Sequence, residues 1–219
     1  MEASAQVPPP PPPTGVPALR YPSNLYAQRQ DRYNRWLPLI KWLLALPHYI
    51  VLAFLFLGVV LGGIGAFFAV LFTGRYPRGV FDYMVGVYGW AWRVQAYAGL
   101  LRDEYPPFSL RPTEPYFAEV QIDYPEEGIA RWRPLVQWLL AIPYLFVANL
   151  LSFVARALII VAFFVILFTE NFPEGLFNLY VGASRWGLRG YAYATFLTER
   201  YPPWDFDELT GPADRRAGG

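Results

Sequence analysis

The sequence predicts an all-α integral membrane protein built as a tandem repeat, in which each copy is an interfacial helix followed by a helical hairpin. The chain of 219 residues is 55% hydrophobic and only 16% charged, which is outside the usual range for a soluble domain. Pro77 and Pro173 lie 96 positions apart (173 − 77), and so do Trp90 and Trp186. Each copy also contains an apolar run long enough to cross a bilayer.

The repeat divides the chain into five parts. They are a disordered proline-rich arm (1–30), repeat A (31–110), a linker (111–128), repeat B (129–206) and a disordered tail (207–219). Six consecutive prolines begin at Pro8, and the arm has too few apolar residues to offset the entropy of ordering. Apolar and polar residues alternate over 117–124 of the linker, which favours a single extended strand outside the membrane.

Each copy begins with a short segment bounded by proline that carries tryptophan and a cation, residues 35–47 in repeat A and 131–143 in repeat B. This composition is typical of a helix at the membrane interface, with its charges facing water. The apolar runs that follow, 49–73 and 145–169, each have a helical length of about 37 Å, against a hydrocarbon core of about 30 Å. Both runs can therefore span the membrane with some tilt.

A second helix-length run follows in each copy, residues 80–101 and 176–197. Because these runs contain charged residues, they are either further spanning helices or amphipathic helices on the surface. With four spans, the arm, the linker and the C-terminus share one side and carry 12 Lys and Arg residues, whereas the hairpin turns carry only Arg75 and Arg78. The positive-inside rule then predicts four spanning helices, cytosolic termini and hairpins inserted in the same sense.

The run 71–82 and the ending 103–110, with Trp90, Arg93 and Tyr97 between them, resemble the bacterial membrane family known as domain of unknown function 4389. The resemblance covers repeat A closely and repeat B less closely, since the turn of repeat B lacks both arginines. It implies a multi-pass protein of the bacterial inner (cytoplasmic) membrane. It implies no activity, cofactor or catalytic residue.

Polar residues and glycines share one stripe of the second helix in each copy. The stripe holds Asp82, Gly86, Gly89 and Arg93 in repeat A, and Asn178, Gly182, Arg185 and Arg189 in repeat B. Such a polar seam either lines a substrate path or forms a tight helix interface, where glycines allow close approach.

Small residues recur every fourth position in the first apolar run, at Gly58, Gly62 and Ala66, and the pattern is missing from repeat B. It predicts a packing face, either within the chain or against a partner or lipid.

Arg156 lies near the middle of the second apolar run, and its counterpart in repeat A is Val60. The shared fold therefore does not require this charge. An arginine facing lipid at this depth costs from about 2.5 to more than 10 kcal/mol, and such residues normally mark a partner or a pathway. Arg156 either bonds backbone carbonyls and aromatic faces inside the protein or is reached by water, or it faces a carboxylate, a lipid headgroup or a cofactor carbonyl from outside the chain.

The sequence contains no recognisable catalytic constellation. There is no cysteine, His48 is the only histidine, and no glycine-rich phosphate loop occurs. His48 is an interfacial histidine or, alternatively, a haem or chlorophyll ligand. A net charge of +1 without a basic stripe argues against nucleic acid. We expect a non-enzymatic accessory or structural subunit without a cofactor that binds lipids or a membrane-protein complex; the alternative is a carrier or channel for a small or lipidic solute.

Overall fold

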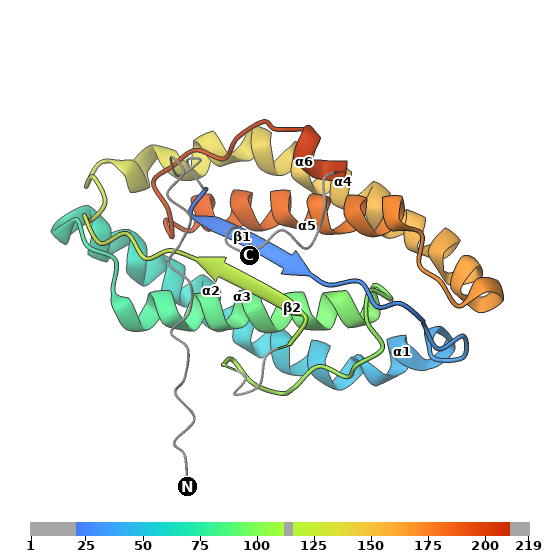
Figure 1. Ribbon diagram of the computed structural model, residues 1–219. Coiled ribbons are helices and arrows are strands. Elements are labelled where there is room, and N and C mark those ends of the chain that lie inside the picture. Colours follow the sequence, from blue (N-terminus) through green and yellow to red (C-terminus); the bar gives the residue numbers. More distant parts are fainter. Residues whose placement is uncertain (1–20, 112–115, 211–219) are drawn as a thin grey trace, which may run out of the picture.

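The computed structural model describes residues 21–111 and 116–210, which form eight helices and strands (Figure 1). In chain order they are β1 (Ser23–Ala27), α1 (Pro38–Leu44), α2 (Leu46–Thr73), α3 (Arg78–Ala98), β2 (Ala118–Ile122), α4 (Arg133–Thr169), α5 (Glu174–Ala194) and α6 (Asp207–Thr210). The chain is thus mostly helical, as predicted. Two helices, α2 and α4, are long and apolar enough to cross a membrane.

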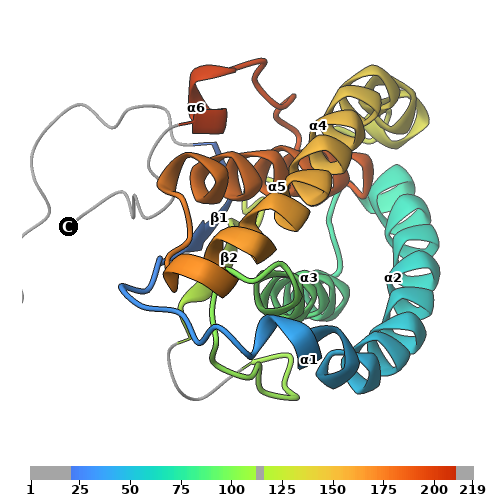
Figure 2. The ribbon, with the colours of Figure 1, turned by 90° about the vertical axis from the view of Figure 1, so that its right-hand side faces the viewer.

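Three layers make up the fold (Figure 2). Helices α3 and α5 form the middle layer, and the antiparallel ribbon of β1 and β2 covers one side of it. Helices α2 and α4 lie on the other side and expose rows of large apolar side chains, such as Phe54 and Phe168, which are 73% and 77% exposed. The core therefore lies between an apolar helical surface and a strand layer.

Each hairpin turns at a residue with left-handed backbone geometry. Gly74 ends α2 with φ of 71°, and Glu170 ends α4 with φ of 56°. Pro77 and Pro173 then occupy the N-cap positions of α3 and α5. Proline suits a helix start because the first N–H groups of a helix have no partner within it.

The two hairpins point in opposite directions, so the predicted insertion in the same sense is wrong. The backbone N–H of Tyr33, before repeat A's helices, donates to the Glu170 carbonyl at 2.9 Å, and that of Ile129 donates to the Gly74 carbonyl at 2.8 Å. Each turn therefore lies beside the start of the other repeat, at opposite ends of the molecule (Figure 1). Strand β2 makes this possible because it returns the chain along α3 before α4 begins.

The arm and the linker are paired with each other. Strand β2 confirms the extended segment predicted in the linker, but it pairs with β1, in register from Ser23 with Ile122 to Ala27 with Ala118. The prediction that residues 1–30 form one disordered arm is therefore wrong for 23–27. The buried inner residues of β1 stabilise its position on the helices. This burial depends on β2, some 95 positions away, and on α5, some 160 positions away, so the local sequence did not reveal it. The polyproline run lies outside the described residues.

The tail and the interfacial segments also differ from the predictions. Helix α6 occupies the first four residues of the predicted disordered tail, and Leu209 is buried there. In repeat A the interfacial segment is the separate helix α1, whereas in repeat B it is continuous with α4, which includes Pro143. Lys41 of α1 does not face water: it is buried, and its Nζ lies 2.8 Å from Asp103 Oδ1. Burial lowers the pKa of Lys41, and Asp103 opposes this shift.

Candidate functional site

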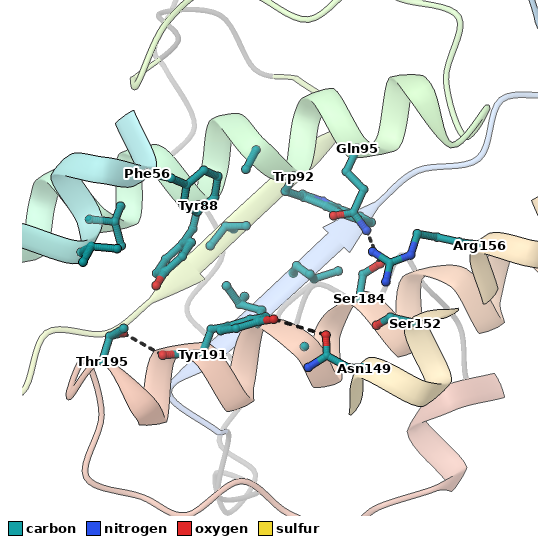
Figure 3. A pocket seen from close by; sticks show the side chains of 17 residues that line it. Phe56, Tyr88, Trp92, Gln95, Asn149, Ser152, Arg156, Ser184, Tyr191 and Thr195 are labelled. Carbon is teal, nitrogen blue, oxygen red and sulfur yellow. Dashed lines mark hydrogen bonds between the residues drawn. The ribbon is translucent and has the colours of Figure 1, made fainter. Parts of the chain in front are cut away.

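A cavity of about 530 Å³ lies where α2, α3, α4, α5 and the ribbon meet, and Figure 3 shows the side chains that line it. Its base includes Leu25 of β1 and Val120 of β2, and its sides come from α2, α3, α4 and α5. A volume of this size is within the range of small-ligand sites.

The cavity lies on the pseudo-twofold axis that relates the two repeats. Leu25 and Val120, which line it, are paired directly across the ribbon. Other lining residues are repeat counterparts, 96 positions apart. These pairs are Phe56 and Ser152, Val60 and Arg156, Tyr88 and Ser184, Ala91 and Gly187, Trp92 and Leu188, and Gln95 and Tyr191.

The two sides of the cavity differ in chemistry although their backbones correspond. At the α2 and α4 positions, repeat A contributes Phe56 and Val60 where repeat B contributes Ser152 and Arg156. Asn149 of α4 also lines the cavity, and its counterpart, Ala53, is apolar. The cavity therefore has a largely apolar wall on α2 and a polar wall on α4.

Most polar side chains in the cavity are held by hydrogen bonds within the protein (Figure 3). Gln95 Nε2 donates to Ser184 Oγ at 3.1 Å, and the Tyr191 hydroxyl donates to Asn149 Oδ1 at 3.3 Å. Ser152 Oγ donates to the Ala183 carbonyl at 3.4 Å. These bonds fix the orientation of the polar wall before any ligand is bound.

Arg156 is the exception in this wall. Its side chain is exposed at the cavity, and it is the one charged residue among the 17 that line it. Within the described parts of the chain, Arg156 makes no hydrogen bond or ion pair. The interpretation that Arg156 bonds carbonyls inside the protein therefore has no support in this geometry, and its guanidinium remains available to a group from outside.

A second, apolar hollow of about 510 Å³ adjoins the cavity along α2. The two share Val59, Val60 and Thr195, and the second continues past Ile64 and Phe67. Together they form a groove between the repeats with Arg156 in one part and only apolar and aromatic side chains, with one threonine and one glycine, in the other. We call these two adjoining hollows together the central groove.

The predicted polar seam does not line the central groove. In repeat A, buried Arg93 donates to the Ser109 carbonyl, and half-exposed Asp82 pairs with Arg111 at 3.1 Å. A Cβ added at Gly86 would lie 3.0 Å from Leu110 Cβ. The loop that follows α3 therefore packs tightly on this stripe, which favours the interface interpretation for repeat A.

Repeat B uses its stripe in a related way. Arg189 is buried, and its Nη2 donates to Asn24 Oδ1 at 2.7 Å, while Arg185 Nε donates to the Leu25 carbonyl at 3.2 Å. Asn178 is half-buried near the start of α5. These arginines hold β1 against α5, so the seam of repeat B is also a structural interface.

The small residues of α2 pack inside the chain, which supports the first of the two predicted roles. A Cβ at Gly58 would lie 2.3 Å from the Tyr83 hydroxyl oxygen, and one at Gly62 would lie 3.1 Å from Val80 Cγ1. Ala66 is fully buried. Glycine is needed at position 58 because Tyr83 of α3 crosses it to donate to the Leu55 carbonyl at 2.8 Å.

His48 is buried in an aromatic cluster. Its Nδ1 accepts from Trp90 Nε1 at 3.1 Å, and its ring stacks on Phe108 at 3.8 Å. In repeat B, Tyr144 stacks on Trp186 in the corresponding place. The shared arrangement indicates a packing role for His48, and no cluster of metal-ligating side chains occurs in 21–111 or 116–210.

Sequence reasoning singled out Arg156 but not the residues around it. Asn149, Ser152, Ser184 and Tyr191 come from two helices and meet only when α4 and α5 pack. The signal that could have found them was the set of repeat positions where an apolar residue in one copy is polar in the other. That comparison separates Asn149 and Ser152 from Ala53 and Phe56.

The fold and the groove define a class: a two-copy helical protein with an apolar outer layer and a ligand-sized space on its symmetry axis. The family model described as Domain of unknown function (DUF4389) matches residues 36–109 and 131–205, so the chain belongs to this family in two tandem copies. Neither the curated proteins nor the solved structures contain a match to the chain.

Proposed function

We propose that this is a small, non-enzymatic integral membrane protein of accessory type, held by α2 and α4 in the bacterial cytoplasmic membrane and binding membrane lipids. The observation that carries the proposal is the polarity of the three layers. Side chains such as Phe54 of α2 and Phe146 of α4 are 73% and 71% exposed, and large apolar residues follow each other along both helices. An apolar surface of this extent marks a membrane or protein contact.

On the opposite side, strand β2 has the alternation of a strand that faces water on one side, whereas four of the five residues of β1 are buried. The inner residues of the ribbon, including Leu25 and Val120, face the helices, whereas Glu119 and Gln121 alternate with them and point outward. A sheet with one apolar and one polar face is typical of this situation. The polarity thus changes across the layers, from α2 and α4 to the ribbon.

This gradient favours helices that lie along the membrane, with the ribbon in the cytosol. If the four long helices spanned the bilayer, the two strands would cross with them, because the strands pack along α3 and α5. Open strand edges do not occur where lipid surrounds them, since their N–H and C=O groups would lack partners. The predicted multi-pass arrangement with four spans is therefore the less favoured form of the proposal. The cytosolic location of the termini, which the count of Lys and Arg predicted for four spans, stays a prediction in this arrangement.

Labelling of single cysteines tests this orientation, because the chain has no cysteine of its own. The exposed positions Arg75, Asn171 and Gln121 represent the two hairpin turns and the ribbon. A membrane-impermeant maleimide should label all three only from the cytosolic side in oriented vesicles. Turns that label from opposite sides, or two turns that label from outside while the ribbon labels from inside, would reject the proposal.

A carrier is the second candidate, because the central groove lies on the axis between two repeats, as substrate sites do in many transporters. The labelling experiment separates the two: a carrier needs parts of the chain to be reached from both sides of the membrane. A stable membrane-protein partner remains a prediction, and co-purification in mild detergent tests it.

A further inference from the structure

We propose that the central groove is a binding site for one anionic lipid, whose acid group pairs with Arg156 and whose acyl chain lies against the α2 wall. This inference rests on the proposed lipid-binding function and adds the site and the chemical class of its ligand. The acid group is a carboxylate or a phosphate, as in a fatty acid or an anionic phospholipid.

The charge of the groove determines the sign of the ligand. Arg156 is the one charged side chain among the 17 described residues that line the main cavity, and none of these 17 is a carboxylate. Guanidinium groups bind carboxylate and phosphate through paired N–H donors. Asn149 lies on the same wall, and the Nδ2–H that does not bond the Leu145 carbonyl can donate to the same headgroup. The Ser152 hydroxyl can donate to it only by leaving its 3.4 Å bond to the Ala183 carbonyl.

The apolar part of the groove determines the tail. From Val60 the space continues past Ile64, Phe67 and Phe68, which are all apolar, and it is open along the face that we place in the bilayer. An acyl chain can therefore enter from the membrane without crossing a polar barrier. A small anion such as inorganic phosphate would fill the polar part alone and leave the apolar hollow unoccupied.

The divergence between the repeats is consistent with such an amphipathic ligand. The fold places Val60 and Arg156 at equivalent positions on the two sides of the axis, and likewise Phe56 and Ser152. Helix packing alone would accept apolar residues on both sides, as repeat A demonstrates. At the α2 and α4 positions the polar residues lie on the α4 wall alone, which matches a molecule with one polar end.

Native mass spectrometry of the full chain in mild detergent tests the proposal, with thermal stability as a second readout. The ligands are oleate, dioleoyl phosphatidylglycerol, zwitterionic dioleoyl phosphatidylcholine and inorganic phosphate. We expect one molecule of oleate or phosphatidylglycerol to bind and to raise Tm, as a ligand of the folded state must. Comparison of these two distinguishes a carboxylate from a phosphate headgroup. Phosphatidylcholine that binds as tightly as phosphatidylglycerol, or inorganic phosphate that stabilises as much as either lipid, would overturn the proposal.

Three variants locate the site. Arg156→Leu should weaken binding of the anionic lipid about tenfold or more and leave the protein folded, because loss of one partner from a charge pair is costly. Val60→Trp places a large side chain at an exposed position shared by both parts of the groove and should also reduce binding. Arg75→Gln removes an exposed cation outside the groove and should bind as the original chain does.

Unchanged lipid binding in Arg156→Leu and Val60→Trp would contradict the inference, whatever their stability. If Arg156→Leu fails to fold, lipid binding by Val60→Trp decides between the outcomes, since Val60 is exposed and can be replaced without filling the core. Binding in detergent does not depend on orientation in a bilayer. Lipid binding can therefore be absent while the cysteine labelling still confirms the proposed orientation. The reverse result would reject the proposed orientation and keep the lipid site.

Discussion

Replacement of Gly58 by alanine tests the close approach of α2 to α3. Alanine stabilises a helix interior by about 1 kcal/mol relative to glycine. At this position, however, the new Cβ would lie 2.3 Å from the Tyr83 hydroxyl oxygen and 2.9 Å from Cζ, so the Tyr83 side chain must move. The movement loses the 2.8 Å hydrogen bond to the Leu55 carbonyl, worth about 1 kcal/mol, and adds about 1–3 kcal/mol of overpacking. We expect a net loss of about 1–3 kcal/mol.

Gly65→Ala on the same helix is the matched control, because a Cβ there meets no atom within 4 Å. It should stabilise the protein by up to about 1 kcal/mol. Thermal unfolding in detergent, followed by tryptophan fluorescence, compares the two, with a shift in Tm of about 2–4 °C for each kcal/mol.

A third variant tests whether the Tyr83 hydroxyl causes the loss of stability in Gly58→Ala. Tyr83→Phe removes the hydroxyl that crosses Gly58, so the double variant should lose less stability than the sum of the two single variants. Equal shifts in Tm for Gly58→Ala and Gly65→Ala would refute the proposed packing of α2 on α3, and Gly58 would then be open to a partner.

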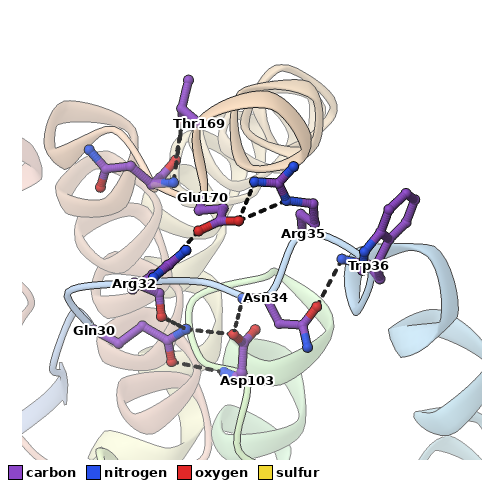
Figure 4. A network of polar contacts seen from close by, with 9 residues as sticks. Gln30, Arg32, Asn34, Arg35, Trp36, Asp103, Thr169 and Glu170 are labelled. Atoms are coloured by element: carbon purple, nitrogen blue, oxygen red, sulfur yellow. Dashed lines mark hydrogen bonds and ion pairs between the residues drawn. The ribbon is translucent and has the colours of Figure 1, made fainter.

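Three further perturbations test β1, the buried Lys41 and the ion pairs of Glu170. Deletion of residues 1–19 should leave the Tm in detergent unchanged, whereas deletion of 1–27 removes β1 and should lower it clearly; equal effects would contradict the role of the ribbon. Lys41→Gln should cost less than about 1 kcal/mol, because the glutamine at the same position of repeat B bonds two carbonyls. Lys41→Met should cost about 3 kcal/mol, because methionine can replace neither the bond to the Arg102 carbonyl nor the contact with Asp103. Two arginines lower the pKa of Glu170 (Figure 4), so its ion pairs stabilise the fold above the usual carboxyl pKa and are lost as the pH falls through the lowered value. Glu170→Gln should therefore lower the Tm at neutral pH, and the difference should disappear in acid; a difference independent of pH would exclude this pairing.

The polar network around Glu170 illustrates why the orientation of the repeats could not be predicted (Figure 4). The carboxylate of Glu170 pairs with Arg32 and Arg35, and Asp103 accepts from Gln30 Nε2 and from the Asn34 N–H, both at 2.7 Å. These contacts join residues 69 or more positions apart. In the sequence, Glu170 is noticeable only because its counterpart in the turn of repeat A is a glycine, Gly74.

The sequence by itself determined the features that depend on neighbouring residues. The 96-residue spacing revealed the duplication, the apolar runs located α2 and α4, and the prolines marked the starts of α3 and α5. The isolated charge of Arg156 stood out for the same reason, since an apolar helix does not need it. Hydrophobic periodicity and the special geometry of proline act within a few residues, so one sequence suffices to read them.

Only the tertiary structure decided how the two copies meet. The pairing of Leu25 with Val120 and the bond from Tyr33 to the Glu170 carbonyl set the repeats antiparallel and place the central groove on their axis. A charge count over loops assumed that every long helix crosses the membrane, and it could not detect that a short ribbon returns the chain along α3. Contacts between residues distant in sequence fix relative orientation, and no local pattern encodes them.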